Sequence, residues 1–131
     1  MDTRKTLLIV DDDPLVLESI DLLLCMTEEF NTIRALGVAG ADSHLQHARI
    51  DIIVADVILA GSTNGIELCR KAIDVYPRIA MVVITADNEV HRSDIPARGI
   101  FLRKPFGGEQ LLDAIHAAIE RAHEGVSGSP R

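Results

Sequence analysis

Five polar side chains stand where short apolar runs of the sequence end. LLIV leads into Asp11 and Asp12, IIVA into Asp56, MVVI into Thr85, and IFLR into Lys104. Three carboxylates in one pocket repel one another, and a hard divalent cation such as Mg²⁺ or Mn²⁺ would stabilise them. A metal-held carboxylate is a nucleophile for phosphoryl groups, and an ammonium and a hydroxyl stabilise the charge of the transferred group. The indicated chemistry is metal-dependent formation of an aspartyl phosphate.

Asp56 is the least expected of these residues, because a buried, unpaired carboxylate costs several kcal/mol. A position at the exit of a strand explains it. Taken singly, the others have ordinary interpretations: Asp11 to Asp13 as a solvated acidic run, Thr85 as a strand residue and Lys104 as a surface charge. Asp13 is interpreted only as a helix cap. The order of all these residues along the chain favours one shared site.

Apolar runs alternate with amphipathic stretches in the elements that must position these residues. Four of the runs are nearly continuous in apolar residues, as expected for a parallel sheet that is covered on both faces. Ligands of such sheets bind beyond the carboxyl ends of the strands. We expect strands at 6–10, 31–36, 51–55, 80–85 and 99–103, and helices at 14–27, 38–48, 65–75 and 108–123.

Composition limits the other classes of function. The 131 residues fit one domain, and the formal charge of −7 argues against nonspecific nucleic-acid or anionic-membrane binding. With no signal peptide and no membrane-length apolar run, we expect a cytoplasmic protein. Cys25 and Cys69 are interpreted as reduced, small core residues, and His44 and His47 as solvated surface residues.

The motifs VDDDP (10–14), ITA (84–86) and LRKPF (102–106), with Asp56 after an apolar strand, resemble the receiver domain of two-component response regulators. The resemblance covers about residues 5–122. It implies a flavodoxin-like (βα)5 three-layer sandwich, with a five-stranded parallel sheet of order 2-1-3-4-5. The receiver domain would span 1–123, followed by a flexible tail at 124–131. Such a domain is a signalling switch that catalyses its own phosphorylation and dephosphorylation.

The resemblance also assigns the acidic residues. Asp56 would be the phosphoacceptor, taking its phosphoryl group from a phosphohistidine on a histidine kinase or a histidine phosphotransfer protein. Asp11, Asp12, Asp56 and the backbone carbonyl of Ile58 would hold Mg²⁺ or Mn²⁺. No direct nucleic-acid or membrane partner is implied, and homodimer formation stays open.

On the other side of the implied site, Lys104 and Thr85 would contact the phosphoryl oxygens. Phe101 would be the aromatic residue whose rotamer follows Thr85 during switching, and Pro105 would follow a cis peptide bond. The downstream target is unknown. We expect a stand-alone receiver, with excision from a longer protein such as a hybrid kinase as the alternative.

Two segments depart from the family pattern. The loop after Asp56, which includes residues 60–63, is one residue longer than usual. The segment between Thr85 and Lys104 is shorter by roughly one helical turn, and Pro96 interrupts it. We therefore expect a fourth helix that is short or irregular. Ile58 and Asp87 occupy positions that vary within the family and influence phosphoryl lifetime.

Two other functions compete with this one. A small-molecule phosphohydrolase or phosphotransferase could use Asp56 as its nucleophile, but such enzymes generally need a second carboxylate close after it, and position 58 is isoleucine. A degenerate receiver that acts only as a binding module is the other alternative. The presence of all five polar residues argues against it.

Overall fold

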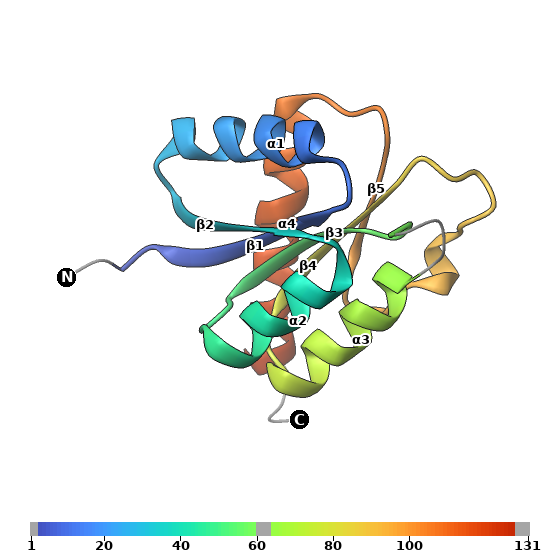
Figure 1. The fold of residues 1–131 in the computed structure, drawn as a ribbon. Helices are drawn as coiled ribbons and strands as arrows, with labels where there is room; N and C mark the ends of the chain where they lie inside the picture. Colours follow the sequence, from blue (N-terminus) through green and yellow to red (C-terminus); the bar gives the residue numbers. More distant parts are fainter. Residues whose placement is uncertain (1–2, 60–63, 128–131) are drawn as a thin grey trace.

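The computed structural model describes residues 3–59 and 64–127 of the chain, so the predicted longer loop at 60–63 lies outside the described residues (Figure 1). Strands and helices alternate along it, as predicted. The elements are β1 (Lys5–Asp11), α1 (Pro14–Thr27), β2 (Phe30–Leu36), α2 (Gly37–His47), β3 (Ile52–Asp56), α3 (Asn64–Val75), β4 (Ala80–Thr85), the 3₁₀-helix η1 (Arg92–Asp94), β5 (Ile100–Arg103) and α4 (Gly108–Ser127).

The five strands form one parallel sheet in the order β2-β1-β3-β4-β5, which confirms the predicted order. The register aligns the strand ends, with Asp11 beside Leu36, Asp56 beside Ile84, and Thr85 beside Arg103. The carboxyl ends of the neighbouring strands β1, β3, β4 and β5 therefore share one edge of the sheet. That edge is where ligands bind in open α/β sheets.

Helices cover both faces of the sheet, as Figure 1 shows: α1 and α4 lie on one face, and α2 and α3 on the other. Successive strand residues point to opposite faces. Ile52 and Val54 therefore pack with α1 and α4, whereas Ile53 and Ala55 pack with α2 and α3. Every residue of β3 and of β4 is buried, which explains why these runs read as continuously apolar.

The strand boundaries agree with the predictions to within one residue at each end, and α1 agrees at both ends. Asp13 caps α1 by accepting a hydrogen bond from the backbone N–H of Leu15, and Pro14 opens the helix. The exception is α4, which continues to Ser127, so residues 124–127 are helical rather than part of a tail. The single glycine at 125 costs the helix only about 1 kcal/mol, too little to end it there. Residues 128–131 of the predicted tail lie outside the described residues.

The segment between β4 and β5 contains only the three-residue η1 where a fourth full helix was in question. The prediction of a short or irregular helix is confirmed. Among residues 3–59 and 64–127, no helix combines the length and the apolar character needed to cross a membrane.

Candidate functional site

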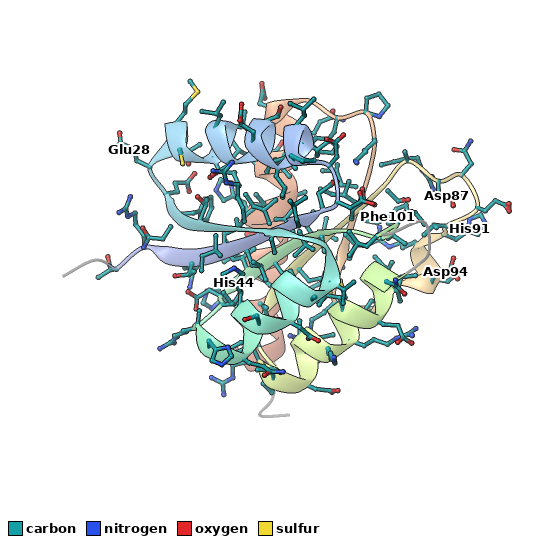
Figure 2. All side chains as sticks on the ribbon, viewed as in Figure 1. Glu28, His44, Asp87, His91, Asp94 and Phe101 are labelled. Carbon is teal, nitrogen blue, oxygen red and sulfur yellow. The ribbon has the colours of Figure 1, made fainter. Side chains whose placement is uncertain are left out.

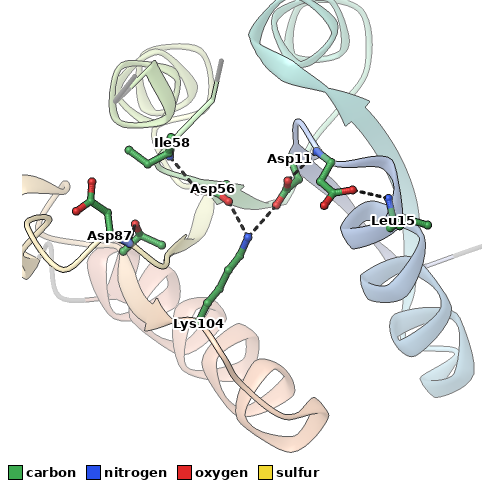
Figure 3. Close-up of polar contacts among 8 residues, drawn as sticks. Asp11, Leu15, Asp56, Ile58, Asp87 and Lys104 are labelled. Atoms are coloured by element: carbon green, nitrogen blue, oxygen red, sulfur yellow. Dashed lines mark hydrogen bonds and ion pairs between the residues drawn. The ribbon is translucent and has the colours of Figure 1, made fainter. Parts of the chain in front are cut away.

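Lys104 lies between two buried carboxylates at the carboxyl edge of the sheet (Figure 3). Its Nζ is 2.9 Å from Oδ2 of Asp56 and 3.5 Å from Oδ2 of Asp11. The three residues come from the ends of β3, β5 and β1, which are separated by as many as 93 positions in sequence. The sheet order therefore creates a charged cluster that lies at the predicted place.

Backbone N–H groups orient the second oxygen of each carboxylate. The N–H of Asp13 donates to Oδ1 of Asp11 at 2.9 Å, and the N–H of Ile58 donates to Oδ1 of Asp56 at 2.9 Å. Each carboxylate thus uses one oxygen for the loop that follows its own strand and the other for Lys104. Two fixed contacts on each group preorganise the cluster for charge-dependent chemistry.

Burial and charge shift the protonation of this cluster. Desolvation is the largest effect at Asp11 and raises its pKa; Asp56 adds to the rise, while the N–H of Asp13 and the charge of Lys104 oppose it. At Lys104, burial is the largest single effect and lowers the pKa. The hydrogen bonds and charges of Asp56 and Asp11 together outweigh that burial, so the pKa of Lys104 is raised. Lys104 is therefore a firmly charged cation, and Asp11 holds its charge at a cost.

Thr85 ends β4 beside this cluster and is completely buried. Its Oγ1 accepts a hydrogen bond from the N–H of Asp87 at 3.0 Å, and its carbonyl accepts one from the N–H of Lys104 at 2.8 Å. The Thr85 hydroxyl and the Lys104 ammonium are thus carried by two backbone segments that are hydrogen-bonded to each other. The peptide bond between Lys104 and Pro105 is cis, which confirms that prediction.

A divalent cation fits part of the predicted ligand set. Asp11 and Asp56 offer hard carboxylate oxygens in one place, and Mg²⁺ typically takes one or two carboxylates together with water and phosphate oxygens. Asp12, the third predicted carboxylate ligand, is exposed and already takes part in another interaction. Within residues 3–59 and 64–127, no three Asp, Glu, His or Cys side chains are arranged to hold a metal ion. The metal-binding roles of Asp11, Asp12, Asp56 and the Ile58 carbonyl stay predictions.

Phe101 is half-buried on β5, where it packs against the core on the α2 and α3 side (Figure 2). The guanidinium carbon of Arg103 lies 5.0 Å from the centre of its ring. Sequence reasoning missed Arg103, because no local pattern indicates its contacts with a loop 13 and 16 residues away.

Sequence reasoning also missed the role of Gly65, the second residue of α3, which lies against the backbone of Asp56 and Val57. A Cβ at this position would lie 2.0 Å from the carbonyl oxygen of Asp56 and 2.7 Å from that of Val57. The sequence prediction placed Gly65 only at the start of the helix at 65–75, although a glycine at such a position can signal close backbone approach.

The cysteine prediction is half wrong. Both cysteines are free, but only Cys69 is buried, and burial raises its pKa to about 12. Cys25 is exposed on α1, like Leu22 and Met26, because α1 carries more apolar residues than its buried face can hold.

The two histidines at the end of α2 take part in no metal site among the described residues. His47 is exposed, as predicted, whereas His44 is half-buried. The Nδ1 of His47 lies 2.8 Å from the carbonyl oxygen of Ser43, so this ring is engaged with its own helix.

Comparison with known proteins agrees with this geometry. Residues 7–116 match the family described as the response regulator receiver domain. The heme response regulator HssR of Staphylococcus saprophyticus is 30% identical over 124 residues, which cover 93% of this chain and 54% of that protein. The phosphate regulon transcriptional regulatory protein PhoB of Pseudomonas aeruginosa is 30% identical over 132 residues, covering 96% of this chain and 56% of that protein. The chain thus spans about half the length of these relatives.

Solved structures share the fold. A response regulator receiver protein of Sinorhizobium medicae superposes with a TM-score of 0.82 at 24% identity, covering 92% of this chain and 98% of that one. A CheY-like receiver domain protein of Methanospirillum hungatei gives a TM-score of 0.79 at 20% identity, covering 94% and 99%. With the strand order, the acidic pair and the matched residues 7–116 in agreement, the chain belongs to the response regulator receiver domain family, the phosphoacceptor domain of two-component systems.

Proposed function

We propose that Asp56 is the residue that accepts the phosphoryl group, from a phosphohistidine on a histidine kinase or a histidine phosphotransfer protein. The observation that carries the proposal is the contact of its buried carboxylate with the Lys104 ammonium at the open edge of the sheet. One oxygen of Asp56 attacks phosphorus as the bond from phosphorus to the imidazole nitrogen breaks. The nitrogen keeps the electron pair, and the histidine leaves as neutral imidazole after taking a proton from solvent.

The neighbouring side chains stabilise the transferred group. The ammonium of Lys104, already paired with Asp56, pairs with one phosphoryl oxygen, and the Thr85 hydroxyl donates to another. The fixed N–H of Ile58 keeps the Asp56 carboxylate in one orientation during attack. The domain in this proposal promotes its own phosphorylation without any base that abstracts a proton.

Mg²⁺, or Mn²⁺, is part of the proposal as the cofactor. Asp11, Asp56, Asp12 and the carbonyl of Ile58 would hold it, and when bound it would neutralise negative charge on the phosphoryl oxygens. The pKa of Asp11 is raised, first by burial and further by the neighbouring Asp56, and this supports the assignment because a bound cation would favour the charged form of the carboxylate.

The downstream partner belongs to the proposal as well. A phosphoryl group of charge near −2 at Asp56 would draw Thr85 and Lys104 toward it, and Phe101 would move inward with Thr85. The relatives named above act in responses to heme and phosphate, as their names say, and neither signal is transferred to this chain. A bias of ~1–3 kcal/mol between two conformations would change the affinity of a partner protein by about 5- to 150-fold.

Intact mass measurement tests the phosphoacceptor. The wild type, incubated with acetyl phosphate and Mg²⁺, is expected to gain one phosphoryl group, about 80 Da. Asp56→Asn should gain no phosphoryl group. The control Asp42→Asn, which changes a carboxylate of α2 paired with Lys71, should gain the same mass as wild type. A gain that persists in Asp56→Asn would reject Asp56 as acceptor, and full labelling with chelator in place of Mg²⁺ would reject the metal.

A further inference from the structure

The Arg103 side chain binds the loop at residues 87–90, which lies in the segment where the family pattern has a fourth helix. Its Nη1 donates to the carbonyl of Asp87 at 2.8 Å, and its Nη2 donates to the carbonyl of Val90 at 3.0 Å. The same guanidinium lies over the Phe101 ring, 5.0 Å from its centre. A planar group with two directed donors and a stacking face suits this position, and lysine could not make all three contacts at once.

The loop held by Arg103 starts at Thr85. The N–H of Asp87 donates to Oγ1 of Thr85 at 3.0 Å, and the N–H of Glu89 donates to Oδ1 of Asp87 at 2.8 Å. The N–H of Val90 in turn donates to the carbonyl of Asp87, and the Val90 side chain is buried in the core. The loop is therefore a small ordered unit, tied to the Thr85 hydroxyl at its start and to Arg103 at two carbonyls.

These contacts connect two residues of the proposed switch through one side chain. Thr85 reaches Arg103 by way of the Asp87 backbone, and Arg103 reaches Phe101 by stacking; Figure 2 labels Asp87 and Phe101 on the same side of the molecule. Any movement of the Thr85 hydroxyl away from the Asp87 N–H removes one of the bonds that order the loop. Any movement of the Phe101 ring removes the surface on which the guanidinium rests.

We propose that Arg103 is a positioning residue that clamps residues 87–90 to β5 in the unphosphorylated domain and releases them when Asp56 is phosphorylated. The release rests on the proposed function, because it begins when Thr85 turns its hydroxyl toward the phosphoryl group. The loop then replaces the missing helix as the segment whose order reports phosphorylation. Lys104, whose N–H donates to the Thr85 carbonyl, keeps β5 in register with β4 while the loop loosens.

Amide hydrogen exchange of the unphosphorylated protein tests the clamp. Arg103→Met keeps length and apolar contact but removes both donors, and the amides of Asp87 and Val90 are expected to exchange about 10- to 30-fold faster, since two net hydrogen bonds of about 1 kcal/mol each are lost. Arg103→Lys should fall between. The control Arg98→Met removes a donor to the carbonyl of Ile79 and should leave these amides unchanged. Exchange in Arg103→Met within twofold of wild type would overturn the clamp.

Phosphorylation with acetyl phosphate and Mg²⁺, followed by intact mass, tests the release. The wild type is expected to exchange its 87–90 amides faster once the mass gain is complete, whereas Arg103→Met, already loosened, should change less than about twofold. A wild-type mass gain without faster exchange would overturn the release and leave the phosphoacceptor intact. Absence of any mass gain would overturn the proposed function and the release together, while the unphosphorylated comparison still decides on the clamp.

Discussion

Replacing Gly65 with alanine is expected to destabilise the domain and to displace the end of β3, which carries the proposed phosphoacceptor Asp56. The added Cβ would lie 2.0 Å from the Asp56 carbonyl oxygen, 2.7 Å from that of Val57 and 2.8 Å from the Val57 Cα. All three are backbone atoms, so no side-chain rotation relieves the contact, and α3 or the end of β3 must shift. The N–H of Gly65 also donates to the Val57 carbonyl at 2.9 Å, which resists that shift.

The size of the effect follows from two opposing contributions. Overpacking typically costs ~1–3 kcal/mol, and the unyielding backbone contacts place this site at the upper end. Alanine in place of glycine returns at most ~1 kcal/mol of helix propensity. The net loss is about 2 kcal/mol, which corresponds to a fall in Tm of about 8 °C for a domain of this size.

Chemical and thermal unfolding of Gly65→Ala measure this loss, and Gly40→Ala is the matched control. Gly40 is also helical, but a Cβ there meets only Ala35, at an ordinary 3.6 Å from its Cβ, so the substitution should be neutral or stabilising. Labelling of Gly65→Ala by acetyl phosphate should slow as well, since Asp56 moves with its carbonyl. If Gly65→Ala unfolded at or above the wild-type temperature, the close approach of α3 to the strand end would not exist in solution.

Three further outcomes are expected from the charged cluster. Because the pKa of Asp11 is raised in the folded state, its contribution to stability is complete below its ordinary value of 3.8 and is lost as pH rises through the folded pKa. Above that range the free energy of unfolding of Asp11→Asn should therefore rise relative to that of wild type. Urea titrations at several pH values measure this difference. The raised pKa of Lys104 acts at alkaline pH, because its stabilising contribution is present below pH 10.5 and is lost only as pH rises through the folded pKa. At high pH the free energy of unfolding of wild type should therefore approach that of Lys104→Met. Mg²⁺ at 100 times its Kd should stabilise wild type by about 2.7 kcal/mol in thermal scans and do much less for Asp11→Asn; equal shifts would contradict a metal held by Asp11.

Most of the architecture could be predicted from the sequence because its signals are local. Buried parallel strands are continuously apolar, and the Asp13-Pro14 pair marks the start of α1. The gathering of Asp11, Asp56 and Lys104 could be predicted once the family resemblance supplied the strand order, since the ends of neighbouring parallel strands meet at one edge. Once the strand order is known, the location of the site needs no further information.

The features that the sequence did not predict depend on contacts between segments that are far apart in the chain. Nothing next to Arg103 in sequence specifies that its guanidinium reaches the carbonyls of Asp87 and Val90. The exposure of Cys25 depends on how α1 is rotated against the sheet, and an apolar helix such as α1 leaves that rotation ambiguous. The exposed position of Asp12 could not be predicted either, because adjacent residues at the end of a strand point in different directions.

The charged cluster itself argues for binding rather than for stability. A carboxylate that served only to stabilise the fold would have its pKa lowered by its partners, yet burial and Asp56 raise that of Asp11 despite Lys104 and the Asp13 N–H. The charged form of Asp11 is thus disfavoured in the isolated domain, and under the proposed function a bound cation would favour it. A single lysine contacts both buried carboxylates, and in the proposed function an incoming phosphoryl group would meet both this lysine and the metal. The same imbalance that weakens the fold is thus the feature by which Asp11 would contribute to phosphoryl transfer.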